Sequence, residues 1–522
     1  MIRLSLVLAV FFCLETGTVR AEVLYQNPVI QGDHPDPSII RVGADYWASS
    51  TSSAWGPLFP LLHSTDLVNW EQTGAVLPHR PAWATGDFWA PEISEFNGKF
   101  FVYYVGRQTN GRLAVAVATA TQPGGPYTDR GPLVAQEDGS IDPAPVTDTN
   151  GARYLVWKED GNSRGRPTPI WAQRLDADGT RLLDQPHELI RNDAAWEGGL
   201  VEGPYVLRRN GWFYLFYSGN GCCGVNCDYA LGVARSHTLF GPWEKNPSNP
   251  SLAGNETWKC PGHGSIVQDE RGRYFFLYHA YSAAGSIFTG REGMLDEVVF
   301  GADDWPTMNQ GRGPSVHAPS PFGAVQINAG ASYADDFTGK HLDSGWQWPQ
   351  RREPVHRLQA GKLLLAATGA ATNFLAAVLA RPTTTTDYAV TTAFETSPRK
   401  PGCALGLCAF GDSENAVGAA YCDGQIITWR RDHGHTRELA RQAAPAAAKL
   451  YLRLTARQGY RFQLEAGADA AHWQPCGGAA DARSLPPWDL SVRVALTVGG
   501  IPNAAGTFDS FEIRPEAMSA SK

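Results

Sequence analysis

The stretch Gly211-Trp-Phe-Tyr-Leu-Phe-Tyr217, a turn glycine followed by aromatic and aliphatic residues, decides the fold because it recurs along the chain. The other copies are Gly43-Ala-Asp-Tyr-Trp47, Gly98-Lys-Phe-Phe-Val-Tyr-Tyr104, Gly151-Ala-Arg-Tyr-Leu-Val-Trp157 and Gly272-Arg-Tyr-Phe-Phe-Leu-Tyr278. Successive glycines are 53 to 61 residues apart, with strand and turn composition and no helical periodicity between them. This period is typical of a β-propeller blade, so five copies predict five blades. The alternative is a β-sandwich with chance spacing.

Composition limits the remaining possibilities. The 522 residues include 55 Gly, 36 Pro and 17 Trp, and only 18% are charged. These values exclude collagen, coiled coil and intrinsic disorder. The formal net charge of −8 provides no basic surface for a phosphate backbone, so no nucleic acid partner is expected. Length alone indicates three or four domains, but one large propeller reduces that number to two.

The amino-acid composition and the strand pattern change after Gly313, and this change defines the domain boundaries. Of the 17 Trp residues, 12 lie between Trp47 and Trp305, and the later part has Ala-rich, alternating strands such as Val492-Arg-Val-Ala-Leu-Thr-Val498. Short strands separated by Gly, Pro and Asp turns are typical of a β-sandwich. We predict an all-β protein in which a five-bladed propeller (22–312) and a linker (313–330) precede a jelly-roll, lectin-like sandwich (331–518).

The first 21 residues are predicted to be a signal peptide. A positive Met-Ile-Arg start precedes an apolar run from Leu4 to Leu14, and Val19-Arg20-Ala21 provides small residues at the cleavage positions. No later apolar run is long enough for a membrane helix. The chain is therefore expected to be secreted or periplasmic, with a retained N-terminal anchor as the alternative.

Eight cysteines remain once Cys13 is removed with the signal peptide, and they form two groups of four. The groups are Cys222, Cys223, Cys227 and Cys260, followed by Cys403, Cys408, Cys422 and Cys476. Each group allows three disulfide pairings, and the sequence does not choose among them. One option joins the neighbours Cys222 and Cys223, with Cys227 bridged to Cys260. Export favours disulfides over a zinc site.

One register of the repeat carries polar or aromatic residues in all five copies. It lies nine positions before the repeat glycine, or seven in the first copy with its shorter turn, and it holds Asp36, Trp89, Asp142, Glu202 and His263. The first strand of each propeller blade lies beside the central axis, so these side chains are predicted to converge on one pocket. Their Gly and Pro neighbours are typical of turns that hold a side chain rigidly.

Three carboxylates beside an imidazole and an indole point to glycosidic bond hydrolysis. That reaction needs one protonated carboxyl to donate to the leaving oxygen and one ionised carboxyl to activate water or attack carbon. A third carboxylate would raise the pKa of the acid by like-charge repulsion. Trp89 is suited to stack on a sugar face.

Each of these residues alone has a simpler explanation. An Asp before Pro is commonly a turn residue, and His263 alone could be a structural histidine or an anchor for calcium or water. Registration across five copies favours function over these explanations. Other acids fall outside the register and are expected to be solvated or turn residues: Asp33, Asp66, Glu92 and Asp138.

These motifs resemble glycoside hydrolase family 43, five-bladed propeller enzymes that include β-xylosidases, α-L-arabinofuranosidases and arabinanases. The resemblance covers residues 26–312 through Asp33-His-Pro-Asp36-Pro, Phe88-Trp-Ala-Pro-Glu92, Ser140-Ile-Asp142-Pro, Val201-Glu202-Gly-Pro and Gly262-His263-Gly. The C-terminal part is similar to the concanavalin A-like domain of the family's β-xylosidases through Asp336-Phe337 and Trp346-Gln-Trp348.

The resemblance implies an inverting mechanism with roles for matching positions. Asp36 matches the general base, Glu202 the general acid, and Asp142 the residue that raises the pKa of the acid and orients it. An inverting enzyme holds its base and acid about 6.5–9.5 Å apart, leaving room for water. Arg291 matches an arginine that binds sugar hydroxyls and the Asp142 carboxylate, with a surface charge pair as the alternative. His263 matches a histidine beneath the pocket that contacts calcium in some members.

The segment Gly221-Cys-Cys-Gly-Val-Asn-Cys227 departs from the family's better-known members. A Cys222–Cys223 disulfide would form an apolar edge against a sugar. The alternative is that the disulfide only stabilises the loop.

We therefore expect an exo-acting glycosidase that releases terminal α-L-arabinofuranose or β-D-xylose from oligosaccharides of hemicellulose or pectin side chains. It requires no cofactor, although a structural calcium is possible. An endo-arabinanase and a non-catalytic carbohydrate-binding propeller are the rival functions.

Overall fold

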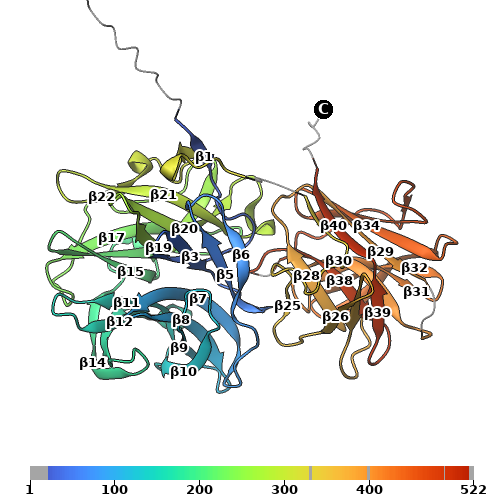
Figure 1. Ribbon diagram of the computed structural model, residues 1–522, viewed down its shortest axis with the longest axis horizontal. Helices are drawn as coiled ribbons and strands as arrows, with labels where there is room; N and C mark the ends of the chain where they lie inside the picture. Colours follow the sequence, from blue (N-terminus) through green and yellow to red (C-terminus); the bar gives the residue numbers. More distant parts are fainter. Residues whose placement is uncertain (1–21, 328–331, 397–399, 487, 517–522) are drawn as a thin grey trace, which may run out of the picture.

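The computed structural model describes residues 22–327, 332–396, 400–486 and 488–516, so the predicted signal peptide lies outside it. Two β-rich units lie next to each other in Figure 1, the N-terminal one on the left. In the described part, no helix is long and apolar enough to cross a membrane. The helical segments are short 3-10 turns: η1 (Gly161–Arg164), η2 (Ala195–Glu197), η3 (Ser286–Phe288), η4 (Asn309–Gly311) and η5 (Pro321–Gly323). The prediction of an all-β protein is confirmed.

The N-terminal unit contains five four-stranded antiparallel sheets, each matching one copy of the sequence repeat. The first is β2 (Ser38–Val42), β3 (Asp45–Ser49), β5 (Leu58–Ser64) and β6 (Glu71–Leu77). The second is β7 (Ala84–Phe96), β8 (Lys99–Gln108), β9 (Leu113–Ala120) and β10 (Thr128–Val134). The third is β11 (Ser140–Thr147), β12 (Arg153–Glu159), β13 (Ile170–Leu175) and β14 (Leu182–Ile190). The fourth is β15 (Val201–Arg209), β16 (Trp212–Gly219), β17 (Ala230–Ser236) and β18 (Glu244–Lys245). The fifth is β19 (Trp258–Gln268), β20 (Tyr274–Ser282), β21 (Glu292–Phe300) and β22 (Pro306–Met308).

The first strands of these sheets contact one another in a closed series. β2 contacts β7, β7 contacts β11, β11 contacts β15, β15 contacts β19, and β19 contacts β2. The chain ends of the unit also pair, because β1 (Leu24–Gln26) is antiparallel to β23 (His317–Pro319). Residues 317–319 lie in the predicted linker, yet they form part of this unit.

The aromatic repeat owes its composition to burial on both faces of the second strand. In β16, Tyr214 and Phe216 pack with residues of the fifth sheet, whereas Phe213, Leu215 and Tyr217 pack with residues of the third. All five are at most 1% exposed. A strand between two neighbouring sheets needs apolar residues on both faces, so it reads as a continuous apolar run.

The C-terminal unit is a β-sandwich built around one core. One sheet has the order β24 (Tyr333–Asp335), β40 (Ser510–Pro515), β29 (Tyr388–Glu395), β34 (Lys449–Arg457), β35 (Arg461–Gly467) and β36 (Gln474–Pro475), and β37 (Ala480–Asp481) also pairs with β35. The other has the order β28 (Ala377–Pro382), β38 (Arg493–Gly499), β30 (Ala404–Phe410), β31 (Ala416–Cys422), β32 (Gln425–Asp432) and β33 (His435–Ala443). A smaller sheet contains β26 (Val355–Gln359), β27 (Lys362–Ala366) and β39 (Ala505–Phe508). Leu405 and Leu407 of one sheet share a core with Leu452 and Leu454 of the other.

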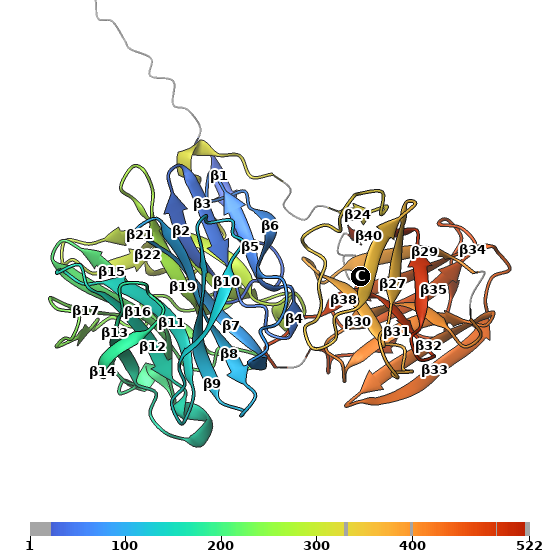
Figure 2. The ribbon, with the colours of Figure 1, turned by 60° about the horizontal axis from the view of Figure 1, so that its bottom comes forward.

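The two units are joined by backbone pairing and a buried ion pair. β25 (Trp348–Pro349) of the C-terminal unit pairs with β4 (Trp55–Gly56), near the interface visible in Figure 2. Arg493 Nη1 lies 3.0 Å from Asp33 Oδ2, with both side chains at most 6% exposed. Removing either partner would leave an uncompensated buried charge, which favours one fixed arrangement of the units.

The cysteines follow the predicted option in the first group and contradict the prediction in the second. Disulfides join Cys222 to Cys223 and Cys227 to Cys260. In the described chain, no disulfide forms within the second group. Strand register explains one excluded pair: Cys408 pairs with Gly418, so Cys422 lies four residues further along β31. That offset is roughly 13 Å, beyond the reach of a disulfide.

Candidate active site

The five register residues lie at irregular positions in or next to the first strands of the five sheets. Register shifts interrupt pairing near Trp89, between Ile141 and Ala144, between Glu202 and Tyr205, and around Gly262. Positive φ angles occur at Asp36 (51°), Ala90 (44°), Asp142 (57°), Gly203 (58°) and His263 (43°). Bulges of this kind redirect a side chain away from its regular alternation. Repeating the bulge in four of the five sheets, with a positive φ at Asp36 just before the first, turns these side chains or their neighbours toward one region.

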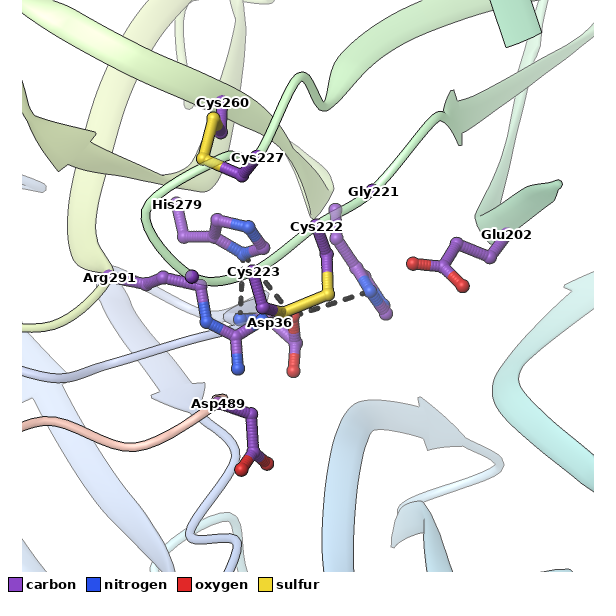
Figure 3. Close-up of a disulfide and its surroundings, with 12 residues drawn as sticks. Asp36, Glu202, Gly221, Cys222, Cys223, Cys227, Cys260, His279, Arg291 and Asp489 are labelled. Atoms are coloured by element: carbon purple, nitrogen blue, oxygen red, sulfur yellow. Dashed lines mark hydrogen bonds and ion pairs between the residues drawn. A yellow bond between two sulfur atoms is a disulfide. The ribbon is translucent and has the colours of Figure 1, made fainter. Parts of the chain in front are cut away.

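Asp36 is the centre of a cationic and polar cluster, shown with His279 and Arg291 in Figure 3. Its Oδ1 lies 3.0 Å from Arg291 Nη1, 3.2 Å from His279 Nδ1 and 3.5 Å from His263 Nδ1. Its Oδ2 accepts a hydrogen bond of 2.7 Å from Thr51 Oγ1. Figure 3 places Glu202 opposite this cluster.

Asp36 is held in its ionised form. Burial alone would raise the pKa of its carboxyl, but Arg291, His263 and His279 outweigh burial and hold that pKa well below its ordinary value. Burial lowers the pKa of His279 to about 4, so its imidazole is neutral at neutral pH. Asp36 is therefore an anionic acceptor, the state that a general base requires.

Glu202, on β15, forms a buried ion pair. Lys158 Nζ, on β12, lies 2.7 Å from Glu202 Oε2 and 2.9 Å from Asp160 Oδ1, and the lysine side chain is 1% exposed. Burial would raise the pKa of Glu202, but the Lys158 ammonium outweighs it and lowers that pKa. The expectation that Asp142 keeps the pKa of Glu202 raised is therefore wrong for this state, because the lysine was not identified from sequence.

Asp142, on β11, holds the proton more readily than its neighbour. Burial raises its pKa to about 6; His263 opposes this shift and the Glu202 carboxylate adds to it. Its Oδ2 accepts a 2.9 Å hydrogen bond from the backbone N–H of Gly203, which fixes it beside the strand that carries Glu202. Interacting carboxyls titrate as a pair, so Asp142 and Glu202 share one proton near pH 6.

His263 approaches Asp36 because the residue after Glu202 is glycine. A Cβ atom on Gly203 would lie 2.8 Å from His263 Cγ, and Gly203 also has a φ of +58°. The possible calcium contact of His263 stays a prediction. Within the described ranges, no group of three or more His, Cys, Asp or Glu side chains is arranged to hold a metal.

Trp89 is half-buried and borders the site from the second sheet. It packs against a small apolar cluster that includes Val105, Leu113 and Ile141, the residue before Asp142. Its indole Nε1 is buried and has no hydrogen-bond partner. Part of the ring therefore packs in the core, and its one polar atom is enclosed without a hydrogen-bond partner.

Arg291 is a buried residue of the site, but its partner differs from the expected one. It is 4% exposed, its Nη1 contacts Asp36, and its backbone N–H donates to Asp33 Oδ1 at 3.2 Å. The predicted pairing with Asp142 is not present. Arg291 immediately precedes β21 of the fifth sheet, which neighbours the first sheet and its Asp36, whereas Asp142 belongs to the third.

The acids outside the register divide into turn residues and buried groups. Asp66 is a turn residue as predicted, because its Oδ1 accepts backbone hydrogen bonds from Val68 and Asn69. The same prediction is wrong for Asp33, which is buried against Arg493 as described above. Asp138 lies in the turn closed by the Gly139 N–H to Gln136 carbonyl hydrogen bond, as predicted, although its side chain is 6% exposed and pairs with arginines. The prediction is also wrong for Glu92, because burial raises the pKa of its carboxyl.

Sequence reasoning missed Lys158 and His279, although a signal for both exists. Each lies seven residues after its repeat glycine, at the end of the aromatic run, as does Ser218. These second-strand positions pair with the first-strand register, as Glu202 with Ser218 and Ile141 with Lys158. A charged residue ending a fully buried apolar run was the available indication.

Comparison with known proteins identifies both units. The model of glycosyl hydrolases family 43 matches residues 25–306. The model of the beta xylosidase C-terminal concanavalin A-like domain matches residues 334–487.

Individual relatives agree with these matches. A xylosidase/arabinosidase from Butyrivibrio fibrisolvens is 31% identical over 310 residues, which cover 56% of this chain and 57% of that protein. A xylosidase/arabinosidase from Humicola insolens is 28% identical, covering 77% of both chains. A solved family 43 protein from Bacillus licheniformis superposes with a TM-score of 0.81 at 25% identity, covering 94% of this chain and 100% of that one.

Proposed function

The chain belongs to glycosyl hydrolase family 43, and we propose that it is an inverting, exo-acting enzyme that releases terminal pentoses from plant cell-wall oligosaccharides. The observation that carries this proposal is the pair Asp36 and Glu202. One carboxylate is held ionised by Arg291, and the other lies opposite it beside a proton-sharing aspartate. Hydrolysis of a glycoside needs two carboxyls in different states.

In the proposed reaction, Asp36 is the general base. Its carboxylate accepts a proton from a water molecule, and that water attacks the anomeric carbon from the face opposite the leaving group. Thr51 and Arg291 fix both oxygens of the carboxylate, so the group is oriented before substrate arrives. Inversion requires the Asp36 and Glu202 carboxyls to be about 6.5–9.5 Å apart.

Glu202 is the proposed general acid, and Asp142 and Lys158 govern its proton. The productive form carries the shared proton on Glu202, which donates it to the glycosidic oxygen as the bond breaks. Lys158 also contacts Asp160, so the ammonium remains paired when Glu202 is protonated. Asp142 supplies the proton from the adjacent strand and is the pKa-modulating residue of this proposal.

The architecture supports a pocket and therefore exo action. We interpret the five sheets as blades of a propeller, which the closed series of first strands supports. Asp489 of the C-terminal unit accepts a 3.1 Å hydrogen bond from Ser53 and lies near Arg291 in Figure 3. This contact narrows the site on one side, whereas an endo-arabinanase requires an open groove. A non-catalytic binding propeller would have no use for three buried carboxyls.

Two classes of pentoside are the proposed substrates. The Butyrivibrio and Humicola relatives are both named xylosidase/arabinosidase, which supports α-L-arabinofuranosides and β-D-xylosides of hemicellulose or pectin side chains. No step of the proposed reaction uses a cofactor. The two disulfides support export to a secreted or periplasmic location, where such bonds persist.

A panel of nitrophenyl pentosides and natural oligosaccharides tests the proposal. We expect release of nitrophenol from the arabinofuranoside, the xyloside or both, and monosaccharide as the first product from oligosaccharides. Early internal fragments would instead identify an endo-acting enzyme. Binding without any hydrolysis would contradict the enzymatic proposal.

A further inference from the structure

The loop with the neighbouring disulfide extends from the strand that pairs with Glu202. Residue Ser218 of β16 pairs with Glu202, and the loop of residues 221–228 follows directly after β16. In the view of Figure 3, the Cys222–Cys223 disulfide is drawn over Asp36, with Arg291 on one side and Glu202 on the other. Both cysteines are partly exposed, so the disulfide is not enclosed in the core.

Two buried tyrosines locate this loop over the site independently of the view. Cys222 packs against a cluster that contains Tyr229 and Tyr281. Burial raises the pKa of the Tyr229 hydroxyl, and the nearby Glu202 carboxylate raises it further. Burial also raises the pKa of Tyr281 to about 12, against the opposing effect of nearby Arg291. The disulfide thus lies over one side chain that neighbours the acid and one that neighbours the arginine.

The loop is held rigidly by contacts at several points. The backbone N–H of Gly221 donates to Asp228 Oδ1 at 2.9 Å, and the backbone N–H of Asp228 donates to the Gly221 carbonyl at 3.1 Å. The second disulfide, Cys227–Cys260, ties the loop to β19. The neighbouring disulfide adds a covalent ring to this frame, so the wall cannot adjust to different ligands.

The chemistry of this wall differs from that of the rest of the site. Asp36, Arg291, Glu202 and Lys158 present charges, whereas a disulfide has no hydrogen-bond donor and a soft, polarisable surface. A pentose ring has hydroxyl edges and apolar C–H surfaces. The charged groups suit the hydroxyls and the reacting atoms, and the disulfide suits a C–H surface.

We propose that the Cys222–Cys223 disulfide is a rigid, specificity-determining wall that packs against the C–H surface of the terminal pentose and discriminates furanose from pyranose rings. The inference rests on the proposed function. An arabinofuranose has a five-membered ring and an exocyclic CH₂OH group, whereas a xylopyranose has a six-membered ring without an exocyclic carbon. A rigid apolar wall distinguishes these shapes through contact, without any change in the acid and base.

The test compares the double variant Cys222→Ala/Cys223→Ala with the matched control Cys227→Ala/Cys260→Ala. The ratio of kcat/KM for nitrophenyl α-L-arabinofuranoside and nitrophenyl β-D-xyloside is measured for each. We expect the ratio of the two kcat/KM values in the first variant to move toward one by at least about fivefold relative to wild type. This is the size of effect that losing one hydrophobic contact produces. The control removes one tie of the loop but keeps the neighbouring disulfide and the Gly221–Asp228 hydrogen bonds, so it should lose less of the preference than the first variant. A ratio within twofold of wild type in the first variant would overturn the proposal.

A reductant provides a second measurement that does not depend on folding of the first variant. In the Cys227→Ala/Cys260→Ala protein, the neighbouring disulfide is the bond of this loop that dithiothreitol can reduce. We expect dithiothreitol to weaken the substrate preference of this protein, and an unchanged preference after confirmed reduction would overturn the wall. Failure of wild type to hydrolyse either pentoside would contradict the proposed function, which separates the two outcomes.

Discussion

Replacing the buried Lys158 by methionine should move the pH profile of the enzyme. The lysine Nζ lies 2.7 Å from Glu202 Oε2, and its Coulomb attraction at an effective dielectric constant near 20 is about 6 kcal/mol. Without the lysine, the repulsion that Asp142 and Asp160 exert on the Glu202 carboxylate changes as well. The figure of about 6 kcal/mol is therefore an upper bound on the effect of the substitution on Glu202. An opposite charge at this distance commonly shifts a carboxyl pKa by about 1–3 units. Lys158→Met should therefore raise the pKa of Glu202.

The assay is kcat/KM against pH for the better nitrophenyl pentoside. Because the free-enzyme acid governs the basic limb of this profile, we expect that limb to move upward by about 1–3 pH units. Lys99→Met is the matched control, since Lys99 pairs with Asp178 at the surface at 3.2 Å. The control should leave the profile unchanged. A basic limb that stays in place or moves downward in a folded Lys158→Met protein would refute the role given to this ion pair.

The same substitution makes a signed prediction for stability. In wild type the pKa of Glu202 is lowered, so its ionised form contributes stability above its ordinary pKa, and this contribution is lost as pH falls. Breaking a buried pair costs about 3–5 kcal/mol. The deficit in the free energy of unfolding of Lys158→Met should be large at neutral pH. It should begin to shrink below about pH 4.5, where the unfolded glutamate protonates, and should go on shrinking as pH falls through the lower pKa of Glu202 in the folded wild type. A deficit that grows toward acid pH would contradict this sign.

Three further outcomes are expected. For wild type, kcat/KM should fall as pH rises through about 6, where the Asp142–Glu202 pair loses its proton; a flat profile to pH 8 would argue against proton sharing. Asp36→Ala and Glu202→Ala should each lower turnover by at least about 10²-fold, with folding followed by circular dichroism, and near-normal hydrolysis by either would exclude its role. Arg493→Met should lower the free energy of unfolding by about 3–5 kcal/mol in denaturant titrations, because it leaves Asp33 buried without its partner; a loss below 1 kcal/mol would show that this pair does not hold the units together.

The sequence repeat predicted the sheets well because its cause is local. A second strand buried on both faces must be apolar throughout, so the pattern is visible without knowledge of contacts. The register of Asp36, Asp142 and Glu202 was equally accessible, because equivalent positions of repeated units occupy equivalent places. Bulges with positive φ at Asp142 and His263 could not be predicted in the same way, because they depend on pairing with the next strand.

Contacts between units distant in sequence were beyond single-sequence reasoning. Asp33 and Arg493 are 460 positions apart, and no motif near either residue indicates that the two form an ion pair. The pKa of Glu202 was predicted wrongly for a different reason: the Lys158 charge beside it, which was missed, outweighs the effect that Asp142 alone would have on that pKa. The second cysteine group shows the same limit: an even count predicted bridges, but strand register keeps Cys408 away from Cys422.

Proton NMR of the first sugar released from a pentoside tests the central claim most directly. If Asp36 activates a water molecule across the anomeric carbon from Glu202, the product should first appear with the anomeric configuration opposite to that of the substrate. It should then mutarotate to the equilibrium mixture. A first product that keeps the configuration of the substrate would contradict the assignment of Asp36 as a general base.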